Sequence, residues 1–258
     1  MMMDPNKTSS LNSVDSGKSQ VDNPEPSSRR GTGAETSSIT IKELAYATLL
    51  GDGYITPGKY KRKNGTISDC NSWFVFAQSN KHREYVDWMV KLFSRFWKIK
   101  IFKRQVGCGY NDKKYIQYGF RTNADPYFTH LRKKVFYPNN NKRITQKILS
   151  QITPFGLAIW WMDDGNLSSQ HSFVLCTDAY TIKEVEIISN WFHRKWNIKW
   201  NITKNNRLQC SVKEGLKLIR LIGQYIIPSM YYKIHLKYSN LNCTRYKAEI
   251  LELPEYKR

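Results

Sequence analysis

The chain contains a weak internal duplication, and this feature constrains its fold more than any other. Phe74-Val75-Phe76 aligns with Phe173-Val174-Leu175 at an offset of 99 residues. When that offset is held without a gap from Phe74 to Ile101, eight of the 28 positions are identical. Each copy reads as a β-rich run, then a stretch with apolar side chains at helical spacing, then a second alternating run. We therefore expect two related structural units in one chain.

Each unit is expected to have the element order αββαββα, which makes the fold class α+β (mixed α/β). A further strand follows each copy, at 115–121 and at 207–212, and each strand is followed by a helix, at 125–135 and at 213–222. An apolar helix also precedes each copy and ends in Gly51-Asp52-Gly53 or Asp163-Asp164-Gly165, where glycine can cap the helix. We expect a first half at 41–150 and a second half at 151–258.

The net charge of +20 lies outside the first 40 residues, which hold four basic and five acidic side chains. That segment, 1–40, is rich in Ser, Asn, Pro and Gly without periodicity, so we expect a disordered leader. A body this basic favours a polyanionic partner, because each phosphate neutralised by Lys or Arg releases condensed counterions. A cationic protein that is merely soluble is the alternative.

Cysteine spacing and hydropathy exclude several protein classes. Five cysteines (Cys70, Cys108, Cys176, Cys210 and Cys243) form no CxxC pair, so neither a zinc knuckle nor a closed disulfide framework is indicated. A reducing compartment fits best. No apolar run reaches the roughly 18 residues that a membrane span needs, and the leader lacks the apolar core of a secretion signal. Its acidic residues argue weakly against an imported transit peptide.

The first unit carries an insertion of 13 residues, because Asp52 lies 22 residues before Phe74 whereas Asp164 lies 9 before Phe173. The inserted segment holds Lys59, Lys61, Arg62 and Lys63 beside Tyr54 and Tyr60. We expect a long basic hairpin arm, since β-ribbons of this kind fit the major groove of DNA. A solvated charged loop is the alternative.

The two apolar helices end abruptly in a carboxylate followed by glycine. Ala47 and Gly51 are four residues apart, so they share one helix face and permit close approach of a partner helix. If the units pack about a pseudo-twofold axis through these helices, Asp52 and Asp164 face each other in a cleft. Two carboxylates at negative helix ends repel each other unless a cation lies between them, which favours a divalent metal such as Mg²⁺.

A basic residue recurs after a proline in both units. Five residues beyond Pro138 and Pro228 stand Arg143 and Lys233, which could offset charge developing on scissile phosphates. An Asp-Gly pair at one helix end is usually only a cap or turn. Its recurrence at equivalent places in a duplicated basic protein strengthens the catalytic interpretation.

The two motifs resemble those of the LAGLIDADG homing endonucleases over the span from about Ile41 to Leu236. The better match is Thr153-Pro154-Phe155-Gly156-Leu157-Ala158-Ile159-Trp160-Trp161-Met162-Asp163-Asp164-Gly165, which is similar to the form found in intron-encoded, double-motif members of mitochondria and chloroplasts. Ile227-Pro228-Ser229-Met230-Tyr231-Tyr232-Lys233 is similar to a later segment of that subgroup. The first motif departs by having Leu50 where the family has its first Asp, and Asp163 stands where a small residue is usual.

The resemblance implies a monomeric, site-specific double-strand DNA endonuclease that hydrolyses phosphodiester bonds and promotes mobility of its host intron. It implies a divalent metal, Mg²⁺ with Mn²⁺ as a substitute, bound by Asp52 and Asp164. Gly51 and Asp163 are the further candidates for the metal site, although Asp163 could instead be only a structural hydrogen-bonding partner. Arg143, Lys233 and Gln78 are the further catalytic candidates. The implied location is an organelle, a mitochondrion or alternatively a chloroplast. The rival reading is an RNA maturase that assists splicing of the host intron, with or without DNA cleavage.

The resemblance also implies two saddle-shaped, four-stranded antiparallel sheets laid along the major groove of DNA. Arg, Lys, Gln and Asn on such strands can read base edges, although a solvent-facing role is the alternative for each. The side chains expected to contact DNA are Lys59, Lys61, Arg62, Lys63, Lys100, Lys103, Arg104, Gln117, Arg121, Lys199, Asn201, Lys204, Arg207 and Gln209.

Overall fold

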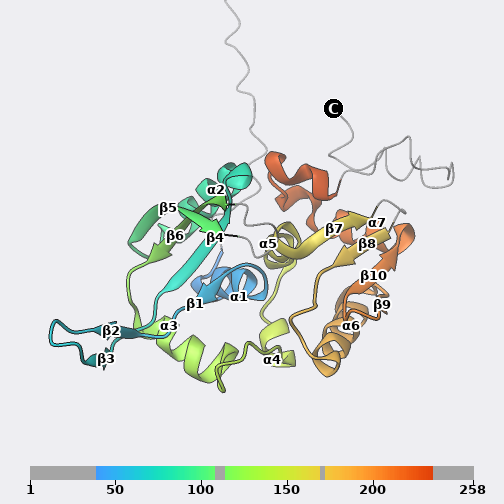
Figure 1. Ribbon diagram of the computed structural model, residues 1–258. Coiled ribbons are helices and arrows are strands. Elements are labelled where there is room, and N and C mark those ends of the chain that lie inside the picture. The colour runs from blue at the N-terminus through green and yellow to red at the C-terminus, as the bar shows by residue number, and fades with distance from the viewer. Residues whose placement is uncertain (1–38, 108–113, 169–171, 235–258) are drawn as a thin grey trace, which may run out of the picture. The chain divides into compact units, whose positions relative to one another are not determined.

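The computed structural model describes residues 39–107, 114–168 and 172–234 (Figure 1). The first part of the chain contains α1 (Ile41–Leu50), β1 (Tyr54–Ile55), β2 (Lys59–Lys61), β3 (Ile67–Asp69), β4 (Phe74–Ser79), α2 (Arg83–Phe93), β5 (Ile99–Gly107), β6 (Lys114–Thr122), α3 (Pro126–His130) and α4 (Gln146–Leu149). The second contains α5 (Pro154–Asp164), β7 (Gly165–Ser168), β8 (Ser172–Leu175), α6 (Ile182–Trp196), β9 (Asn201–Ile202), β10 (Leu208–Ser211) and α7 (Val212–Ile222). The leader expected at 1–40 lies, except for its last two residues, outside the described residues, as do Cys108 and Cys243.

Two four-stranded antiparallel sheets share one strand order, β1-β4-β6-β5 in the first and β7-β8-β10-β9 in the second (Figure 1). Their registers also correspond, because Tyr54 lies opposite Val75 on β4 and Asn166 lies opposite Val174 on β8. These two valines are the positions that the duplication aligned. The α+β class and the repeated αββαββα order are therefore confirmed.

Helices α1 and α5 pack against each other in the middle of a shared hydrophobic core. Each starts with a threonine N-cap, Thr40 or Thr153, whose hydroxyl accepts a backbone N–H of the first turn. A Cβ added to Gly156 of α5 would lie only 3.3 Å from Cβ of Ala47, so the small residue predicted to permit a close approach lies at the contact. Among the described helices, none is long and apolar enough to cross a bilayer.

The glycines after the motif helices differ from the left-handed cap that the sequence suggested. Gly51 and Gly165 are the C-cap residues of α1 and α5, but their φ angles are −93° and −75°. Because neither φ angle is positive, backbone conformation does not require glycine at these positions. Steric exclusion by a neighbouring side chain does. A Cβ at Gly51 would lie 2.2 Å from Oδ2 of Asp163, and a Cβ at Gly165 would lie 2.2 Å from the indole of Trp161. Both glycines are required because another side chain occupies the volume.

The insertion in the first unit forms the expected hairpin arm. Strands β2 and β3 pair as a two-stranded antiparallel ribbon, with Lys59 opposite Asp69 and Lys61 opposite Ile67. Gly65 supplies the left-handed residue of the turn, at φ +85°. All four basic side chains predicted for the arm are exposed, namely Lys59, Lys61, Arg62 and Lys63.

The helix expected at 125–135 is interrupted. Asp125 caps α3 by accepting the N–H of Tyr127, and Pro126 occupies the first turn, which agrees with the predicted start. After five residues the chain widens into a π-helical segment, Leu131–Phe136. This segment and α4 line a cavity together with Lys42 and Tyr46 of α1.

Candidate active site and nucleic-acid interface

The C-terminal ends of α1 and α5 meet at the acidic residues. Asp52 follows α1 after one glycine, and Asp164 is the last residue of α5. The backbone N–H of Asp52 donates to Oδ2 of Asp163 at 3.1 Å, across the junction between the two helices. The N-terminal ends meet as well, since the Thr153 hydroxyl donates to the Glu43 carboxylate. The helix pair is thus fixed at both ends.

The two predicted metal-binding carboxylates have different surroundings. Asp52 is exposed, and its Oδ2 accepts a hydrogen bond from Nε2 of Gln78 at 2.5 Å. Burial, and then the charge of Asp52, raises the pKa of Asp164 to about 7, although Lys142, Trp160 and Lys233 act in the opposite direction. The indole N–H of Trp160 donates to Oδ2 of Asp164 at 3.1 Å. Gln78 and Trp160 therefore orient one carboxylate each.

Asp163 points into the protein rather than toward Asp164. Its Oδ1 accepts the hydroxyl of Tyr85 at 2.8 Å, and its Oδ2 accepts the N–H of Asp52. Burial, followed by the charges of Asp52 and Asp164, raises the pKa of the Asp163 carboxyl well above its usual range. With both oxygens engaged, this carboxyl joins α5 to the end of α1 and to α2. The backbone carbonyl of Asp163 accepts a hydrogen bond from Lys233.

Two lysines lie at equivalent places beside the helix ends. Nζ of Lys142 donates to the carbonyl oxygens of Gly51 at 2.9 Å and Leu50 at 3.3 Å. Nζ of Lys233 donates to the carbonyl oxygen of Asp163 at 2.7 Å. Each ammonium therefore interacts with the negative end of a motif helix. Burial lowers the pKa of both lysines, and the three aspartates counteract that effect.

The structure places Lys142, and not Arg143, in the position that corresponds to Lys233. Arg143 is exposed, and its Nε donates to the carbonyl of Val135 at 3.2 Å, on another surface. The shift by one residue arises in the backbone after each proline. The chain forms a 3₁₀ helix from Pro228 to Lys233, whereas after Pro138 it is irregular and passes through Asn140 at φ +63°.

Two tyrosines that sequence reasoning missed connect the units. Tyr85 of α2 reaches Asp163 of the second unit, and Tyr180 before α6 donates to the carbonyl of Leu50 in the first unit at 2.9 Å. Both side chains are buried, and both bond to the motif helix of the other unit. No spacing in the sequence identified them, because their partners are 78 and 130 residues away.

The donors around the acidic pair fit a hard divalent cation. In the described part of the chain, no three His, Cys, Asp or Glu side chains form a ready metal cluster. What the site offers is oxygen: the carboxylates of Asp52 and Asp164 and the carbonyls of Gly51 and Asp163. Mg²⁺ prefers such ligands and keeps part of its water shell. Burial, and then repulsion by Asp52, raises the pKa of Asp164, and a cation would relieve both effects.

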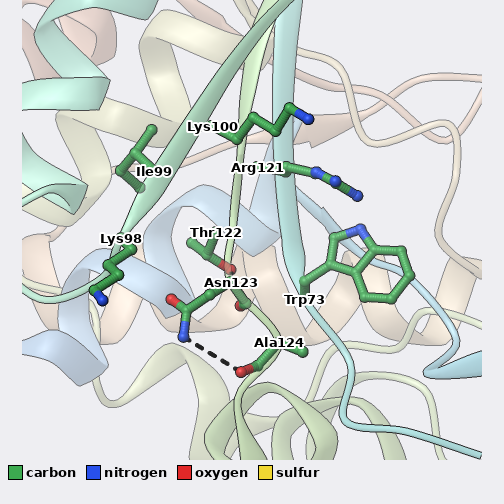
Figure 2. Close-up of a pocket in the computed structure, with 8 residues that line it drawn as sticks. All are labelled: Trp73, Lys98, Ile99, Lys100, Arg121, Thr122, Asn123 and Ala124. Carbon is green, nitrogen blue, oxygen red and sulfur yellow. Dashed lines mark hydrogen bonds between the residues drawn. The ribbon is translucent and has the colours of Figure 1, made fainter.

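One face of the first sheet gathers basic and amide side chains. Lys100 on β5 lies opposite Arg121 on β6, and Arg104 lies opposite Gln117, whose Oε1 accepts from Nε of Arg104 at 2.8 Å. Figure 2 shows the side chains of Lys100 and Arg121 extending toward the side on which the Trp73 indole lies. The Arg121 guanidinium is 5.8 Å from the centre of that ring.

Lys103 lies on the opposite face of the same sheet. Its partner in register is Tyr118, which is buried beneath α2 and donates its hydroxyl to Asp87 at 2.8 Å. Because successive strand residues point to opposite faces, Lys103 is separated from Lys100 and Arg104. The structure therefore brings together four of the five side chains predicted on this sheet.

The second sheet presents fewer basic side chains. Gln209 lies opposite Asn201 and donates to the Ser172 hydroxyl at 2.8 Å. Arg207 forms an ion pair with Asp178 at 2.6 Å. Lys204 is exposed in the turn between β9 and β10. These residues form a polar surface on the second sheet, in which the charge of Arg207 is already neutralised by Asp178.

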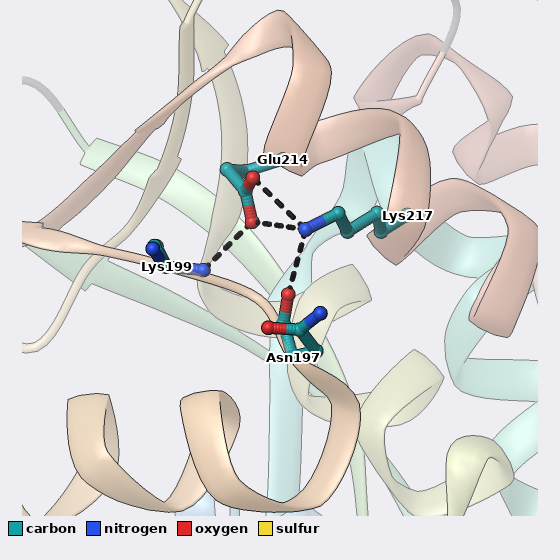
Figure 3. A network of polar contacts seen from close by, with 4 residues as sticks. All are labelled: Asn197, Lys199, Glu214 and Lys217. Atoms are coloured by element: carbon teal, nitrogen blue, oxygen red, sulfur yellow. Dashed lines mark hydrogen bonds and ion pairs between the residues drawn. The ribbon is translucent and has the colours of Figure 1, made fainter.

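A partly exposed polar network fixes the approach to β9 and thereby the backbone position of Lys199. The backbone N–H of Lys199 donates to Glu214 at 2.8 Å, and Lys217 bonds both Glu214 oxygens at 2.9 Å and the carbonyl of Asn197 at 2.7 Å (Figure 3). Burial alone would raise the pKa of Glu214, but these hydrogen bonds and the lysine charges lower it. The exposed Lys199 side chain is thus held at the start of the strand by its own backbone.

Comparison with known proteins agrees with this geometry. The model of the LAGLIDADG DNA endonuclease family matches residues 42–218. The chain is 28% identical over 213 residues to the cytochrome b mRNA maturase bI2 of Saccharomyces cerevisiae, covering 76% of this chain and 48% of that protein. It is 28% identical over 212 residues to a protein of Wickerhamomyces canadensis named probable intron-encoded endonuclease 1, covering 77% and 85%.

A solved structure shares the fold. It is the homing endonuclease I-WcaI bound to its DNA recognition sequence, with a TM-score of 0.61, 27% identity, and coverage of 76% of this chain and 86% of that one. The chain spans about half the length of the S. cerevisiae relative. Because the family model matches well over half of the chain, and because the repeated sheets and paired acidic helix ends agree with it, this protein belongs to the LAGLIDADG DNA endonuclease family.

Proposed function

We propose that this protein is a site-specific endonuclease that cuts both strands of double-stranded DNA by hydrolysis. The observation that carries this proposal is the meeting of Asp52 and Asp164 at the joined ends of α1 and α5, flanked by Lys142 and Lys233. A protein that only bound nucleic acid would have no use for two neighbouring carboxylates, one of which has its pKa raised by burial and by the charge of the other.

The carboxylates of Asp52 and Asp164, with the carbonyls of Gly51 and Asp163, would hold divalent metal, for which Mg²⁺ is our proposal and Mn²⁺ a substitute. When bound, such ions activate water and stabilise the leaving oxygen of a phosphodiester. The residues of the chain prepare this step. Gln78 fixes the orientation of Asp52, and Trp160 fixes that of Asp164. Asp163 fixes the backbone of Asp52.

Lys142 and Lys233 contribute positive charge on either side of the acidic pair. In the free protein each ammonium is hydrogen-bonded to a backbone carbonyl beside one of the two acidic residues. A phosphate entering the site adds negative charge, and a partly buried ammonium stabilises that charge more strongly than one in bulk water. We assign one lysine to each strand, with Lys142 in the role that the sequence suggested for Arg143.

The proposed DNA surface comprises the polar face of both sheets and the β2–β3 arm. Lys100, Arg104, Gln117 and Arg121 share one face of the first sheet, and the arm adds exposed cations beyond it. Arg, Gln and Asn side chains suit base edges, whereas the lysines suit phosphates. Because one chain supplies two sheets, we propose that it acts as a monomer.

We further infer that the protein promotes the mobility of its host intron in an organelle, a mitochondrion rather than a chloroplast. Relatives in two yeasts carry names that refer to introns or to cytochrome b mRNA. The abundance of Asn, Lys, Ile and Tyr also fits an A·T-rich gene of the organelle type.

The test is cleavage of a plasmid that carries the two flanking exons joined without the intron, in the presence of Mg²⁺. Asp52→Asn and Asp164→Asn should each abolish cutting while DNA binding survives, because they remove charge without changing shape. Asp87→Asn, an exposed carboxylate of α2 outside the site, is the matched control and should cut normally. Unchanged cutting by both site variants would overturn the assignment.

An RNA maturase that assists splicing of the host intron is the second candidate. It is favoured by the names of the S. cerevisiae relative and of a Debaryomyces hansenii relative, which is 29% identical over 199 residues, covering 74% of this chain and 72% of that protein; both are named cytochrome b mRNA maturase bI2. Splicing of the host intron RNA with and without the purified protein distinguishes the two functions. Splicing at equal rates would remove this candidate.

A further inference from the structure

A second basic site lies at the other end of α1, away from the acidic pair. It is a cavity of about 330 Å³ between α1, α3 with the π-helical segment Leu131–Phe136, and α4. Lys42 in the first turn of α1 lines it. Lys42 is ten residues before Asp52, or about 15 Å along the helix axis, and Tyr46, which also lines the cavity, is six residues or about 9 Å before it. None of the side chains proposed above to contact DNA lines it.

The floor of the cavity is aromatic and apolar, with one unsatisfied polar group. Tyr46 and Tyr127 line it together with Leu131 and Ile148. The hydroxyl of Tyr127 is buried and has no hydrogen-bond partner within the described part of the chain. Buried polar groups are nearly always paired in native proteins, so this residue of the cavity lining carries a hydroxyl that still lacks a partner among the described residues.

The rim of the cavity is cationic. Lys42, His130, Lys134, Arg143 and Lys147 surround it, and all five are exposed. Within the described residues, no acidic side chain lines the cavity, and none of the five cations forms an ion pair. Such a rim attracts a polyanion through counterion release. The combination of an aromatic floor and a cationic rim fits a phosphodiester chain that presents an unpaired base.

We propose that this cavity binds single-stranded RNA, with one unpaired base against the tyrosine floor and the flanking phosphates on the rim. Bases in a duplex are paired and stacked and cannot enter a pocket, whereas unpaired RNA bases are commonly held on aromatic side chains. A ribose 2′-hydroxyl both donates and accepts hydrogen bonds, so on a small movement of the Tyr127 ring toward the ligand it would satisfy the Tyr127 hydroxyl in a way that deoxyribose cannot. The site is separate from the proposed DNA surface, so the two can be occupied together.

The test compares two double variants of equal charge. Lys134→Ala with Lys147→Ala removes two rim cations, and Lys91→Ala with Lys183→Ala removes two exposed lysines from α2 and α6 as the control. The probe is fluorescent oligouridine of about 12 nucleotides, with oligodeoxyuridine of equal length beside it. Two lost phosphate contacts should weaken binding about 25-fold at about 0.1 M salt, since each contributes roughly 0.7 to the logarithmic salt slope of a single strand.

The expected result is that the rim variant binds oligouridine about 25-fold more weakly while the control variant binds as the unmodified protein does. Cross-links from 4-thiouridine should fall on peptides within 126–148, and Tyr127→Phe should reduce the preference for oligouridine over oligodeoxyuridine. Equal binding by both double variants, cross-links confined to the sheets, or no preference for ribose would overturn the proposal. A parallel loss of DNA cleavage in the rim variant would also overturn it, because the cavity would then serve the DNA site.

Discussion

The hydrogen bond from Tyr85 to Asp163 gives the sharpest prediction. Tyr85→Phe removes only a hydroxyl, which is 2.8 Å from Oδ1 of a carboxyl whose other oxygen accepts the N–H of Asp52. Tyr85 is completely buried, so water cannot replace the lost donor. A buried acceptor left without a partner costs about 2 kcal/mol. In a domain of this size, that corresponds to a decrease in Tm of roughly 4–8 °C.

Tyr118→Phe is the matched control. Its hydroxyl also donates to an aspartate at 2.8 Å, but the side chain of that residue, Asp87, is 44% exposed. Water can therefore solvate Asp87 after the substitution, and the loss should stay below about 1 kcal/mol. Thermal and urea unfolding followed by circular dichroism measures both variants. Equal losses, or a larger loss for Tyr118→Phe, would refute the argument that burial sets the magnitude.

A double-mutant cycle assigns the effect to the pair. Tyr85→Phe and Asp163→Ala should show a coupling of about 1–2 kcal/mol, because each removes the hydrogen bond between these two side chains. Both single variants should also slow DNA cleavage at saturating substrate, since Asp163 positions the backbone of Asp52. Additive stabilities in the cycle would mean that the two side chains are independent and that Asp163 is fixed by other contacts.

Three further predictions concern charge. Lys142→Met should slow single-turnover cleavage by about 100-fold, while Arg143→Met, one residue away, should leave the rate near normal. A larger loss for Arg143→Met would show that Arg143, and not Lys142, acts on the scissile phosphate. The free energy of unfolding of the metal-free protein should fall as pH rises from about 4 to about 7, because Asp164 has a pKa of about 7 when folded against an ordinary 3.8, so the native state holds an extra proton throughout that window. Urea titrations of Asp164→Asn should show a shallower slope but not a flat one, because the pKa of Asp163 is raised as well and Asp163 keeps its own contribution; an unchanged slope would contradict the assignment. Replacing Lys59 and Lys61 of the arm with alanine should lower the salt slope of duplex DNA binding by about 1.8, as measured by anisotropy, if both contact phosphate; an identical slope would mean that the arm lies in solvent.

Much of the fold followed from local pattern. The duplication predicted two units, and strand and helix periods placed most elements, because those periods reflect burial on one face. The spacing of Ala47 and Gly51 also predicted the helix contact correctly. The hairpin arm followed from the insertion length. These features depend on neighbours in sequence, and so the sequence shows them directly.

What the sequence did not provide depends on loops and on distant partners. Lys142, rather than Arg143, lies beside the helix end because the loop after Pro138 is irregular. In an irregular loop, the spacing in sequence does not predict which side chain faces the site. The sequence predicts both Lys103 and Arg104 as DNA contacts, but adjacent strand residues face opposite sides of the sheet. The two consecutive apolar residues Ile101 and Phe102 hide the alternation that would separate them. The role of Asp163 required its distant partners, which no spacing in the chain reveals.

The fit of Asp163 over Gly51 has a consequence for how the two halves can assemble. These residues directly precede Asp52 and Asp164, so they occupy equivalent places, yet one has no side chain and the other fills the space it leaves. Two copies of the second half would set two buried carboxyls against each other, and two copies of the first half would leave a void. Neither half is a good partner for itself. The two halves therefore fit each other at this position better than either would fit a copy of itself.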